Sequence, residues 1–243
     1  MNLNSIIKSL CPPILISVLQ RIKKSTLISV LRKIKKSTII RKGTTTSQDL
    51  DMYWDPNFAE VLETWGEGNA WNEIQLLMAG RKGKVLDIAC GTGKTISILL
   101  KFEELDLFGC DISEMLLSKA SEKHNIPMNK LRACDATKLP YADNEFNYAF
   151  SIGSIEHFTE EGIVKFLSEC YRTVSHISFH QHPVSRSGQN EGWITSTQSY
   201  HNNSIEWWKE KYDEVYDSVY VLDSVWEDGI SLGRWFICEK KNN

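Results

Sequence analysis

The sequence lacks several patterns that would assign it to common classes of protein. None of its six cysteines belongs to a C-x-x-C pair, which excludes the usual zinc and disulfide frameworks. No uninterrupted apolar run approaches the ~20 residues that a membrane-spanning helix needs. The first 42 residues contain no acid, although they hold 10 lysines and arginines. These absences predict a cytoplasmic protein with reduced thiols and no metal site, preceded by a basic leader that does not cross a membrane.

Charge divides the 243 residues into two parts. Residues 43–243 carry 18 bases and 31 acids, a net charge of −13, whereas the leader is purely basic. An acidic body argues against a catalytic face that tracks nucleic acid, so we expect no nucleic-acid partner. We therefore predict a basic leader and linker over residues 1–45 and one enzyme domain over residues 46–243.

The leader contains an internal repeat. Residues Leu15–Thr26 and Leu27–Thr38 match at 10 of 12 positions. Twelve helical residues leave an angular offset of about 120°, so the apolar faces of the two copies do not form one stripe. This spacing predicts two short amphipathic helices, and their bases predict peripheral contact of residues 8–42 with the anionic inner face of a membrane. A disordered tail or an organelle transit peptide are the alternatives.

The most informative segment is Val85–Thr95, an apolar strand that leads through an acid into a glycine turn and a helix. A phosphate-binding P-loop would need a glycine at Ile88, and a dinucleotide fingerprint would need one at Ile96. Neither pattern is complete. What is present is an acid, Asp87, four residues before Gly91, at the strand end where ligands bind in open α/β sheets. A cationic group on a cofactor would suit that acid, and capping of the turn is its alternative role.

This segment resembles motif I of the class I S-adenosylmethionine-dependent methyltransferases, with Ala89 in place of the motif's first glycine. Three further stretches resemble the following strands of that family in order. They are Leu107–Asp111, Leu131–Ala136 and Phe146–Ser151 followed by Ile155–Phe158. The likeness covers roughly residues 84–160.

The resemblance implies that S-adenosylmethionine is the cofactor. Asp111 would hold the ribose hydroxyls, as in dinucleotide sites also, and Asp135 would meet the adenine amino group. The acids at positions 87 and 135 favour S-adenosylmethionine over a dinucleotide. The expected cofactor-binding residues are Asp87, Ala89, Gly91, Gly93, Asp111, Ile112, Asp135, Ala136 and Ser151.

The alternation of apolar strands and amphipathic helices predicts an α/β fold with a parallel sheet. We expect helices over 58–65, 71–79, 93–102, 113–124 and 160–173, and strands over 84–89, 106–110, 130–134, 146–151 and 174–180. Two further strands, 214–223 and 233–239, have no helix between them and predict an antiparallel pair. The resemblance implies a three-layer Rossmann-like fold with strand order 3-2-1-4-5-7-6, strand 7 being antiparallel.

Histidines supply the candidate catalytic bases, because imidazole titrates near neutral pH. His157 follows the fourth predicted strand, and His180 and His182 follow the fifth. A structural role is the alternative for each. His180 and His182 lack a third ligand nearby in the sequence, so no metal site is predicted.

We expect the residues that bind the methyl acceptor to lie outside the predicted cofactor segment. Most of the eight tryptophans lie there, and the insert 183–201 is rich in hydrogen-bonding residues that would suit a sugar. The sequence therefore predicts methyl transfer to a hydroxyl or amine of a small molecule, a sugar or a sugar-linked intermediate of surface-polysaccharide synthesis. An RNA or protein methyltransferase and a non-catalytic S-adenosylmethionine-binding scaffold at the membrane are the alternatives.

Overall fold

The computed structural model describes residues 48, 50–195 and 198–240. The predicted leader over residues 1–45, with its repeat and its membrane contact, lies outside the described residues and stays a prediction.

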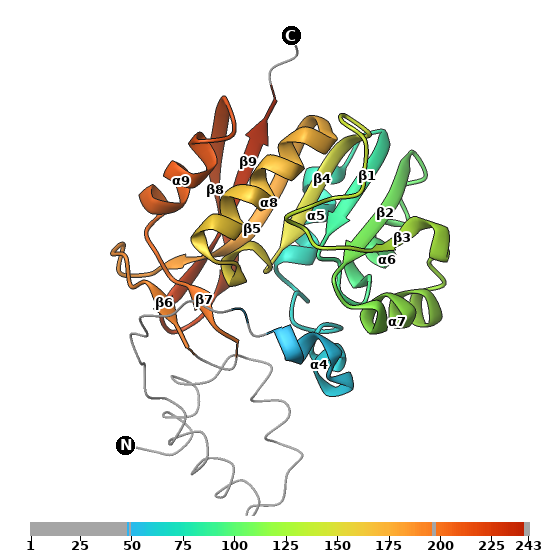
Figure 1. The fold of residues 1–243 in the computed structure, drawn as a ribbon, viewed down its shortest axis with the longest axis horizontal. Helices are drawn as coiled ribbons and strands as arrows, with labels where there is room; N and C mark the ends of the chain where they lie inside the picture. The colour runs from blue at the N-terminus through green and yellow to red at the C-terminus, as the bar shows by residue number, and fades with distance from the viewer. Residues whose placement is uncertain (1–47, 49, 196–197, 241–243) are drawn as a thin grey trace, which may run out of the picture.

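A seven-stranded sheet of order β3-β2-β1-β4-β5-β9-β8 forms the centre of the domain (Figure 1). The first five strands are parallel, and β9 runs antiparallel to both β5 and β8. The strands are β1 (Gly83–Ile88), β2 (Leu105–Asp111), β3 (Leu131–Ala133), β4 (Phe146–Ile152), β5 (Val174–Ser185), β8 (Ser218–Glu227) and β9 (Ser231–Glu239). A separate small sheet pairs β6 (Trp193–Ile194) with β7 (Tyr200–His201).

The strand order differs from the predicted 3-2-1-4-5-7-6 because β6 and β7, which sequence reasoning missed, take the sixth and seventh places along the chain. The final pair also differs in its bounds. Residues 205–213 form a helix, β8 begins four residues later than expected, and residues 228–230 alone separate it from β9. β8 is displaced by four residues at the same length, and β9 begins two residues earlier than expected, because the alternation of this edge pair continues into the segment that was predicted as its loop.

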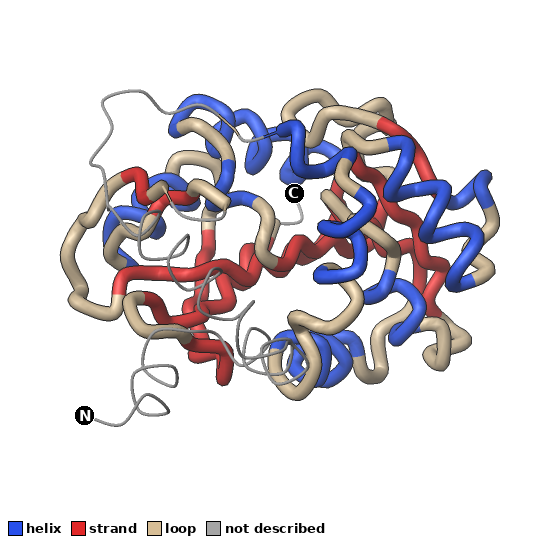
Figure 2. Tube along the Cα trace, turned by 90° about the horizontal axis from the view of Figure 1, so that it is seen from below, coloured by secondary structure: helices blue, strands red, loops and turns tan. Residues whose placement is uncertain are grey.

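Helices cover both faces of the sheet (Figures 1 and 2). On one face Val85 packs in a core with α5, α6 and α7, while Leu86 and Ile88 point into a second core beneath α8 and α9. Burial on both faces explains why β1 reads as an almost unbroken apolar run. The helices are η1 (Leu50–Trp54), α4 (Pro56–Val61), α5 (Ala70–Met78), α6 (Lys94–Leu99), α7 (Glu114–His124), η2 (Met128–Lys130), η3 (Ile155–His157), α8 (Glu160–Thr173) and α9 (Ile205–Asp213).

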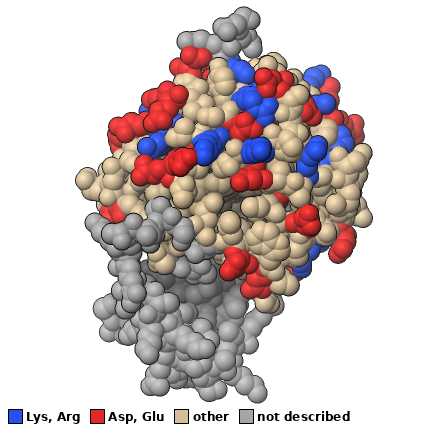
Figure 3. Space-filling model, viewed as in Figure 1, with Lys and Arg blue, Asp and Glu red and all other residues tan. Residues whose placement is uncertain are grey.

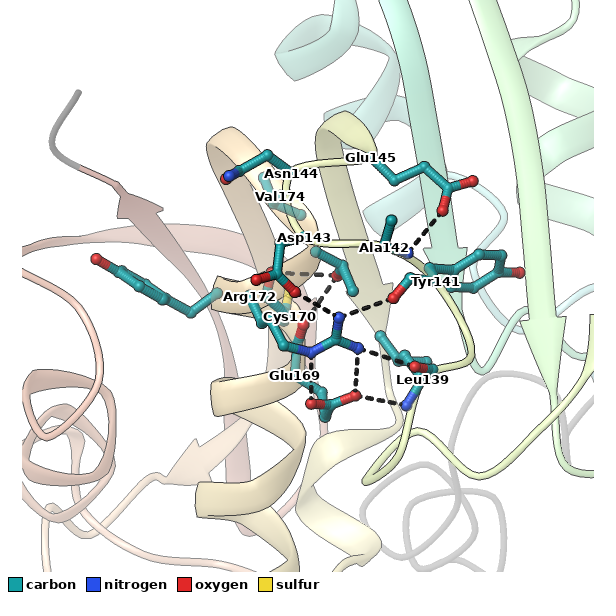
Figure 4. Close-up of polar contacts among 12 residues, drawn as sticks. Leu139, Tyr141, Ala142, Asp143, Asn144, Glu145, Glu169, Cys170, Arg172 and Val174 are labelled. Atoms are coloured by element: carbon teal, nitrogen blue, oxygen red, sulfur yellow. Dashed lines mark hydrogen bonds and ion pairs between the residues drawn. The ribbon is translucent and has the colours of Figure 1, made fainter. Parts of the chain in front are cut away.

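Arg172 of α8 holds the long connection between β3 and β4 in place (Figure 4). Its guanidinium donates to both carboxylate oxygens of Glu169 at 2.9 and 2.8 Å and to the Asp143 carboxylate at 2.9 Å. It also donates to the carbonyl oxygens of Leu139 and Tyr141 at 2.9 and 2.7 Å. The planar fork of arginine can satisfy this many acceptors at once. The connection that carries the predicted adenine-binding acid is therefore fixed without a helix of its own.

Glu73 of α5 ties the first layer of helices to the far edge of the sheet. Its carboxylate accepts from the Ser224 hydroxyl at 2.7 Å, the Val225 backbone N–H at 2.6 Å and the Trp235 indole N–H at 2.6 Å. Trp235 is 2% exposed, so its N–H has little access to water. A buried donor that loses its acceptor costs free energy, and hydrogen bonds to a charged group are the stronger kind.

We predict that Glu73→Ala lowers the free energy of unfolding by about 2–3 kcal/mol, because it leaves the Trp235 N–H unpaired. Urea unfolding followed by tryptophan fluorescence measures the change. Glu67→Ala, at an exposed position before the same helix, is the control and should alter stability by less than about 0.5 kcal/mol. Equal stability of the two variants would show that Glu73 does not anchor the edge strands.

Candidate functional site

The glycine turn after β1 has the backbone conformation that a ligand cradle requires. Ala89, Gly91 and Gly93 all have positive φ angles, of 58°, 55° and 70°. A side chain at Gly93 would place its Cβ 2.6 Å from Ile126 Cδ1 and 2.9 Å from Ala120 Cβ. Gly93 therefore allows the turn and α6 to approach α7 closely. Ala89 adopts the left-handed conformation although it carries a Cβ, which explains why a glycine is the usual residue at this place in the motif that it resembles.

Asp111, at the end of β2, connects this turn to the next helix. One carboxylate oxygen accepts from the Gly91 N–H at 2.9 Å, and the other accepts from the Ser113 N–H at 2.9 Å. The Ser113 hydroxyl oxygen in turn accepts from the Leu116 N–H at 3.3 Å and caps α7. Burial raises the pKa of Asp111, and the N–H groups of Ser113 and Gly91 oppose that effect. The carboxylate thus lies at the carboxyl end of the strand, where the predicted ribose site requires an acceptor.

Asp87 lies in β1 beside Asp111 and is 4% exposed. Among the described residues, its Oδ2 atom has no hydrogen-bond partner. Burial raises the pKa of Asp87 well above its ordinary value, and the nearby Asp111 raises it further. An orphaned buried carboxyl next to a second acid fits a ligand that carries a positive charge, and S-adenosylmethionine is such a ligand. The residues present therefore fit the cofactor that the resemblance implies.

The other predicted cofactor residues divide into two groups. Ile112, which is 37% exposed, follows β2, and the exposed Asp135 and the buried Ala136 follow β3 at the same edge of the sheet. Asp135 Oδ1 accepts from the backbone N–H and the hydroxyl of Thr137, both at 2.8 Å, which fixes its turn. Ser151 lies elsewhere. Its side chain is fully buried, 2.8 Å from His180 Nδ1, so it points into the core and we do not retain it as a cofactor ligand.

His180 and His182 lie within β5, which extends to Ser185, rather than after it. Both are fully buried. Burial lowers the pKa of each to about 3, so both rings are neutral. His182 stacks on Phe236 at 4.7 Å between ring centroids, and its Nε2 lies 3.1 Å from the Tyr212 hydroxyl. These contacts correct the expected catalytic role of both histidines, because neither ring has access to an acceptor.

His157 lies in η3, directly after β4, with its side chain 11% exposed. Its Nδ1–H donates to the Ser199 carbonyl oxygen at 2.7 Å, so the lone pair of the neutral ring is on Nε2. That nitrogen lies 3.6 Å from Glu156 Oε1. His157 is thus at the strand edge where the sequence predicted it, held between the insert and a buried acid.

Glu156 is a site residue that sequence reasoning missed. It is 3% exposed, and its Oε2 lacks a hydrogen-bond partner in the described part of the chain. Burial raises its pKa to about 8. The signal in the sequence was an acid in the turn four residues after the end of an apolar strand, but only the structure shows that its carboxyl is buried.

Tyr53 links the segment before α4 to both sides of this edge. Its carbonyl oxygen accepts from the Ser113 hydroxyl at 2.6 Å, and its own hydroxyl accepts from the Gln198 amide at 2.7 Å. Leu62 approaches the glycine turn, because a Cβ at Gly91 would lie 3.0 Å from its Cδ1. The segment before β1 and the insert together form a roof over the carboxyl edge of the sheet.

Fewer tryptophans lie at the carboxyl edge of the sheet than the sequence predicted. Trp208 and Trp235 are core residues, and Trp193 of the insert is 8% exposed and packs on His201 at 4.8 Å between ring centroids. The flat apolar face that the insert was expected to present to a sugar is therefore turned inward at Trp193. Trp65 is the one that reaches the site, as described below.

Residues 85–176 match the methyltransferase domain family. A ubiquinone/menaquinone biosynthesis C-methyltransferase of Desulfotalea psychrophila is 30% identical over 46% of this chain and 46% of its own length. A probable tRNA methyltransferase 9B of Mus musculus is 30% identical over 45% of this chain and 24% of its own length. The chain thus aligns with less than half of the length of these relatives.

The crystal structure of a SAM-dependent methyltransferase from Methanosarcina mazei has a similar fold. The two structures superpose with a TM-score of 0.56 at 16% sequence identity. The superposition covers 69% of this chain and 96% of the other. Residues 85–176 are accordingly similar to a methyltransferase domain, and the described residues share the fold of the Methanosarcina mazei structure.

We predict that Asp111→Asn weakens S-adenosylmethionine binding by about tenfold to a hundredfold, because the amide removes a charge-assisted acceptor and turns an N–H donor toward Gly91 or Ser113. Isothermal titration calorimetry measures the affinity. Asp106→Asn is the matched control on the same strand, since that exposed acid only pairs with Lys130 at the opposite edge. Unchanged affinity in Asp111→Asn would contradict the assignment of the ribose site.

Proposed function

We propose that this protein transfers a methyl group from S-adenosylmethionine to a hydroxyl or amine of a small molecule, most specifically a sugar or a sugar-linked intermediate of surface-polysaccharide synthesis. The observation that carries the proposal is the glycine turn joined to the Asp111 carboxylate, with the orphaned carboxyl of Asp87 beside it.

The bound cofactor supplies a methyl group that is already activated on a sulfonium. The protein must therefore align the acceptor with the S–CH3 bond and exclude water. The positive φ angles of the glycine turn let its backbone approach the ligand, and Asp111 fixes the turn against β2. The hydrogen bond between Tyr53 and Gln198 joins the two segments that lie over this edge.

Methylation of a hydroxyl or amine releases a proton from the acceptor. His157 and Glu156 are the titratable pair directly after β4, where the acceptor would approach, and only 3.6 Å separates His157 Nε2 from Glu156 Oε1. A carboxyl–imidazole pair at this distance can receive that proton without moving the backbone.

Charge favours a small acceptor over a nucleic acid. On the face that carries α8 and α9, acids and bases of the described residues are interspersed instead of forming a basic stripe (Figure 3). Nucleic-acid binding relies on such a stripe to neutralise phosphates. RNA methylation is the second candidate, since one relative is a probable tRNA methyltransferase.

We predict that the protein methylates a member of a panel of nucleotide sugars and lipid-linked glycans, read as a mass gain of one methyl group by mass spectrometry. Asp111→Asn, which weakens cofactor binding, should lower that turnover by about tenfold or more at limiting cofactor. Transfer RNA is included in the panel. Methylation of tRNA alone would replace the small-molecule proposal, and cofactor binding without turnover on any acceptor would favour a scaffold.

We also propose that residues 8–42 attach the enzyme to the anionic cytoplasmic face of a membrane. None of the helices in the described part of the chain is long and apolar enough to cross a membrane. The attachment therefore rests on the 10 bases of the leader, each of which contributes about 1 kcal/mol near an anionic surface.

We predict that deletion of residues 1–42 releases the protein from vesicles that contain phosphatidylserine while leaving its S-adenosylmethionine affinity unchanged. Vesicle co-sedimentation and calorimetry measure the two properties. Neutral phosphatidylcholine vesicles are one control, because they carry no net negative charge. High salt is the other, because ions screen the attraction of the bases to anionic lipid. Equal sedimentation of the full-length and shortened proteins would rule out attachment by the leader.

A further inference from the structure

Glu156 is a buried acid that the fold pairs only in part, because its own backbone N–H is a hydrogen-bond donor to the carboxyl. Among the described residues, its single ion partner is His157, at 3.6 Å, and its Oε2 atom has no hydrogen-bond partner. Removal of a carboxylate from water without a partner is costly, so such groups are usually neutral or are matched by a ligand. Asp111, which is buried to a similar degree, instead accepts from two backbone N–H groups.

The carboxyl of Glu156 lies close to the backbone at the carboxyl end of β4. Gly153, directly after β4, has a φ of 63°, and a Cβ there would lie 3.3 Å from the Trp65 ring and 3.8 Å from Glu156 Oε1. The carboxyl, the ring and the bare backbone of Gly153 therefore meet at one point. Because β4 pairs directly with β1, this point adjoins the glycine turn at the same edge of the sheet.

The groups around Glu156 keep a constant charge over the neutral range. Burial lowers the pKa of His180 and His182 to about 3 and that of His201 to about 4, so these rings stay neutral. Burial raises the pKa of Tyr200 to about 12, and it raises that of Tyr212 well above its ordinary value. Beside His157, η3 contacts β5, β7 and α8, whose titratable and charged side chains are His176, His180, His182, Tyr200, His201, Glu160, Glu161, Lys165, Glu169, Cys170, Tyr171 and Arg172. Tyr212 of α9 also lies close enough for Glu156 to raise its pKa.

Glu160 and His157 differ from the other neighbours of Glu156. Glu160 is exposed at the start of α8 and pairs with Lys211 at 3.1 Å, so its charge is held at the surface. His157 touches Glu156 itself. Elsewhere at this edge, burial raises the pKa of Asp87 and Asp111, and the hydrogen bond from Cys110 lowers the pKa of the Cys134 thiol. The Glu156→Gln and His157→Gln variants therefore decide whether a change between pH 7 and pH 9 comes from either of these two residues.

We propose that Glu156 is the counter-ion of the cofactor's sulfonium and the final acceptor of the proton that methyl transfer releases. This assignment rests on the proposed function and names a group within its site. The charge of the ligand explains why the protein provides no cationic lysine or arginine within ion-pair distance of Glu156 among its described residues.

The charges and atoms of the step balance. Before transfer, the site holds a sulfonium cation, the Glu156 carboxylate and a neutral acceptor with an O–H or N–H bond. The acceptor oxygen or nitrogen forms a bond to the methyl carbon as the S–CH3 bond breaks, and the electron pair of that bond stays on sulfur. The acceptor's proton passes to Glu156. Afterwards the site holds a neutral thioether, a neutral methylated product and a neutral carboxylic acid, so no charge is left buried.

The test compares S-adenosylmethionine with S-adenosylhomocysteine by calorimetry at pH 7 and pH 9. The two ligands share every group except the methyl and the charge on sulfur, so their affinity ratio largely cancels effects on the rest of the molecule. Burial places the pKa of Glu156 at about 8. Its ionised fraction therefore rises from about a tenth to about nine tenths, and the preference for the sulfonium should increase by about tenfold.

Glu156→Gln keeps the shape of the side chain and should abolish this increase, whereas Glu156→Asp should restore part of it. Glu169→Gln is the control, because that partly buried acid already pairs with Arg172 away from the glycine turn and should leave the increase intact. Thermal melts show whether each variant is folded. In the unaltered protein, titrations at pH 7 in two buffers of different ionisation enthalpy should show proton release with S-adenosylmethionine and none with S-adenosylhomocysteine.

Loss of the increase in His157→Gln, with its retention in Glu156→Gln, would overturn the proposal in favour of His157. A ratio that stays constant with pH in the unaltered protein would also overturn it, while leaving the proposed function in place. If neither ligand binds to the unaltered protein, the proposed function itself fails.

Discussion

The Asp111 carboxylate is the contact on which the arrangement of the site depends. Its two oxygens bind the N–H of Gly91 in the turn after β1 and the N–H of Ser113 at the start of α7. One buried side chain thus sets the position of the glycine turn and of the next helix. Desolvation opposes the ionised form, and the two backbone donors offset that penalty.

The same edge of the sheet concentrates carboxyl groups in a poorly hydrated place. Asp87, Asp111 and Glu156 are each less than 7% exposed, and repulsion from Asp111 adds to the burial that raises the pKa of Asp87. A neutral ligand would leave this repulsion unrelieved, whereas a cation lowers the energy of all the ionised forms together. These carboxyl groups therefore suit a ligand that carries a positive charge.

The cofactor half of the fold could be predicted from sequence because its signals are local. An apolar strand followed by an acid and glycines at 91 and 93 specifies the turn, and alternation of strands with helices specifies the parallel sheet. The observed elements from β1 to α8 lie within a few residues of the expected ranges.

The other half depends on contacts that a single sequence does not display. His180 and His182 were expected beyond the end of a strand, but β5 continues to Ser185 and carries both rings into the core. Helix α9 was missed because Trp208 and Tyr212 bury in a core formed with distant strands. The inward direction of Glu156 has no sequence pattern at all, since it follows from a 3-10 turn after β4.

The hydrogen bonds of Glu73 have a consequence for the order in which the domain folds. Its partners Ser224, Val225 and Trp235 are separated from it by 151, 152 and 162 residues. Contacts of such sequence separation form late, because the intervening chain must first be ordered. The contacts of α5 with β8 and β9 therefore form after the strands that lie between them in the sequence, so α5 is the described helix whose final position depends on the latest part of folding.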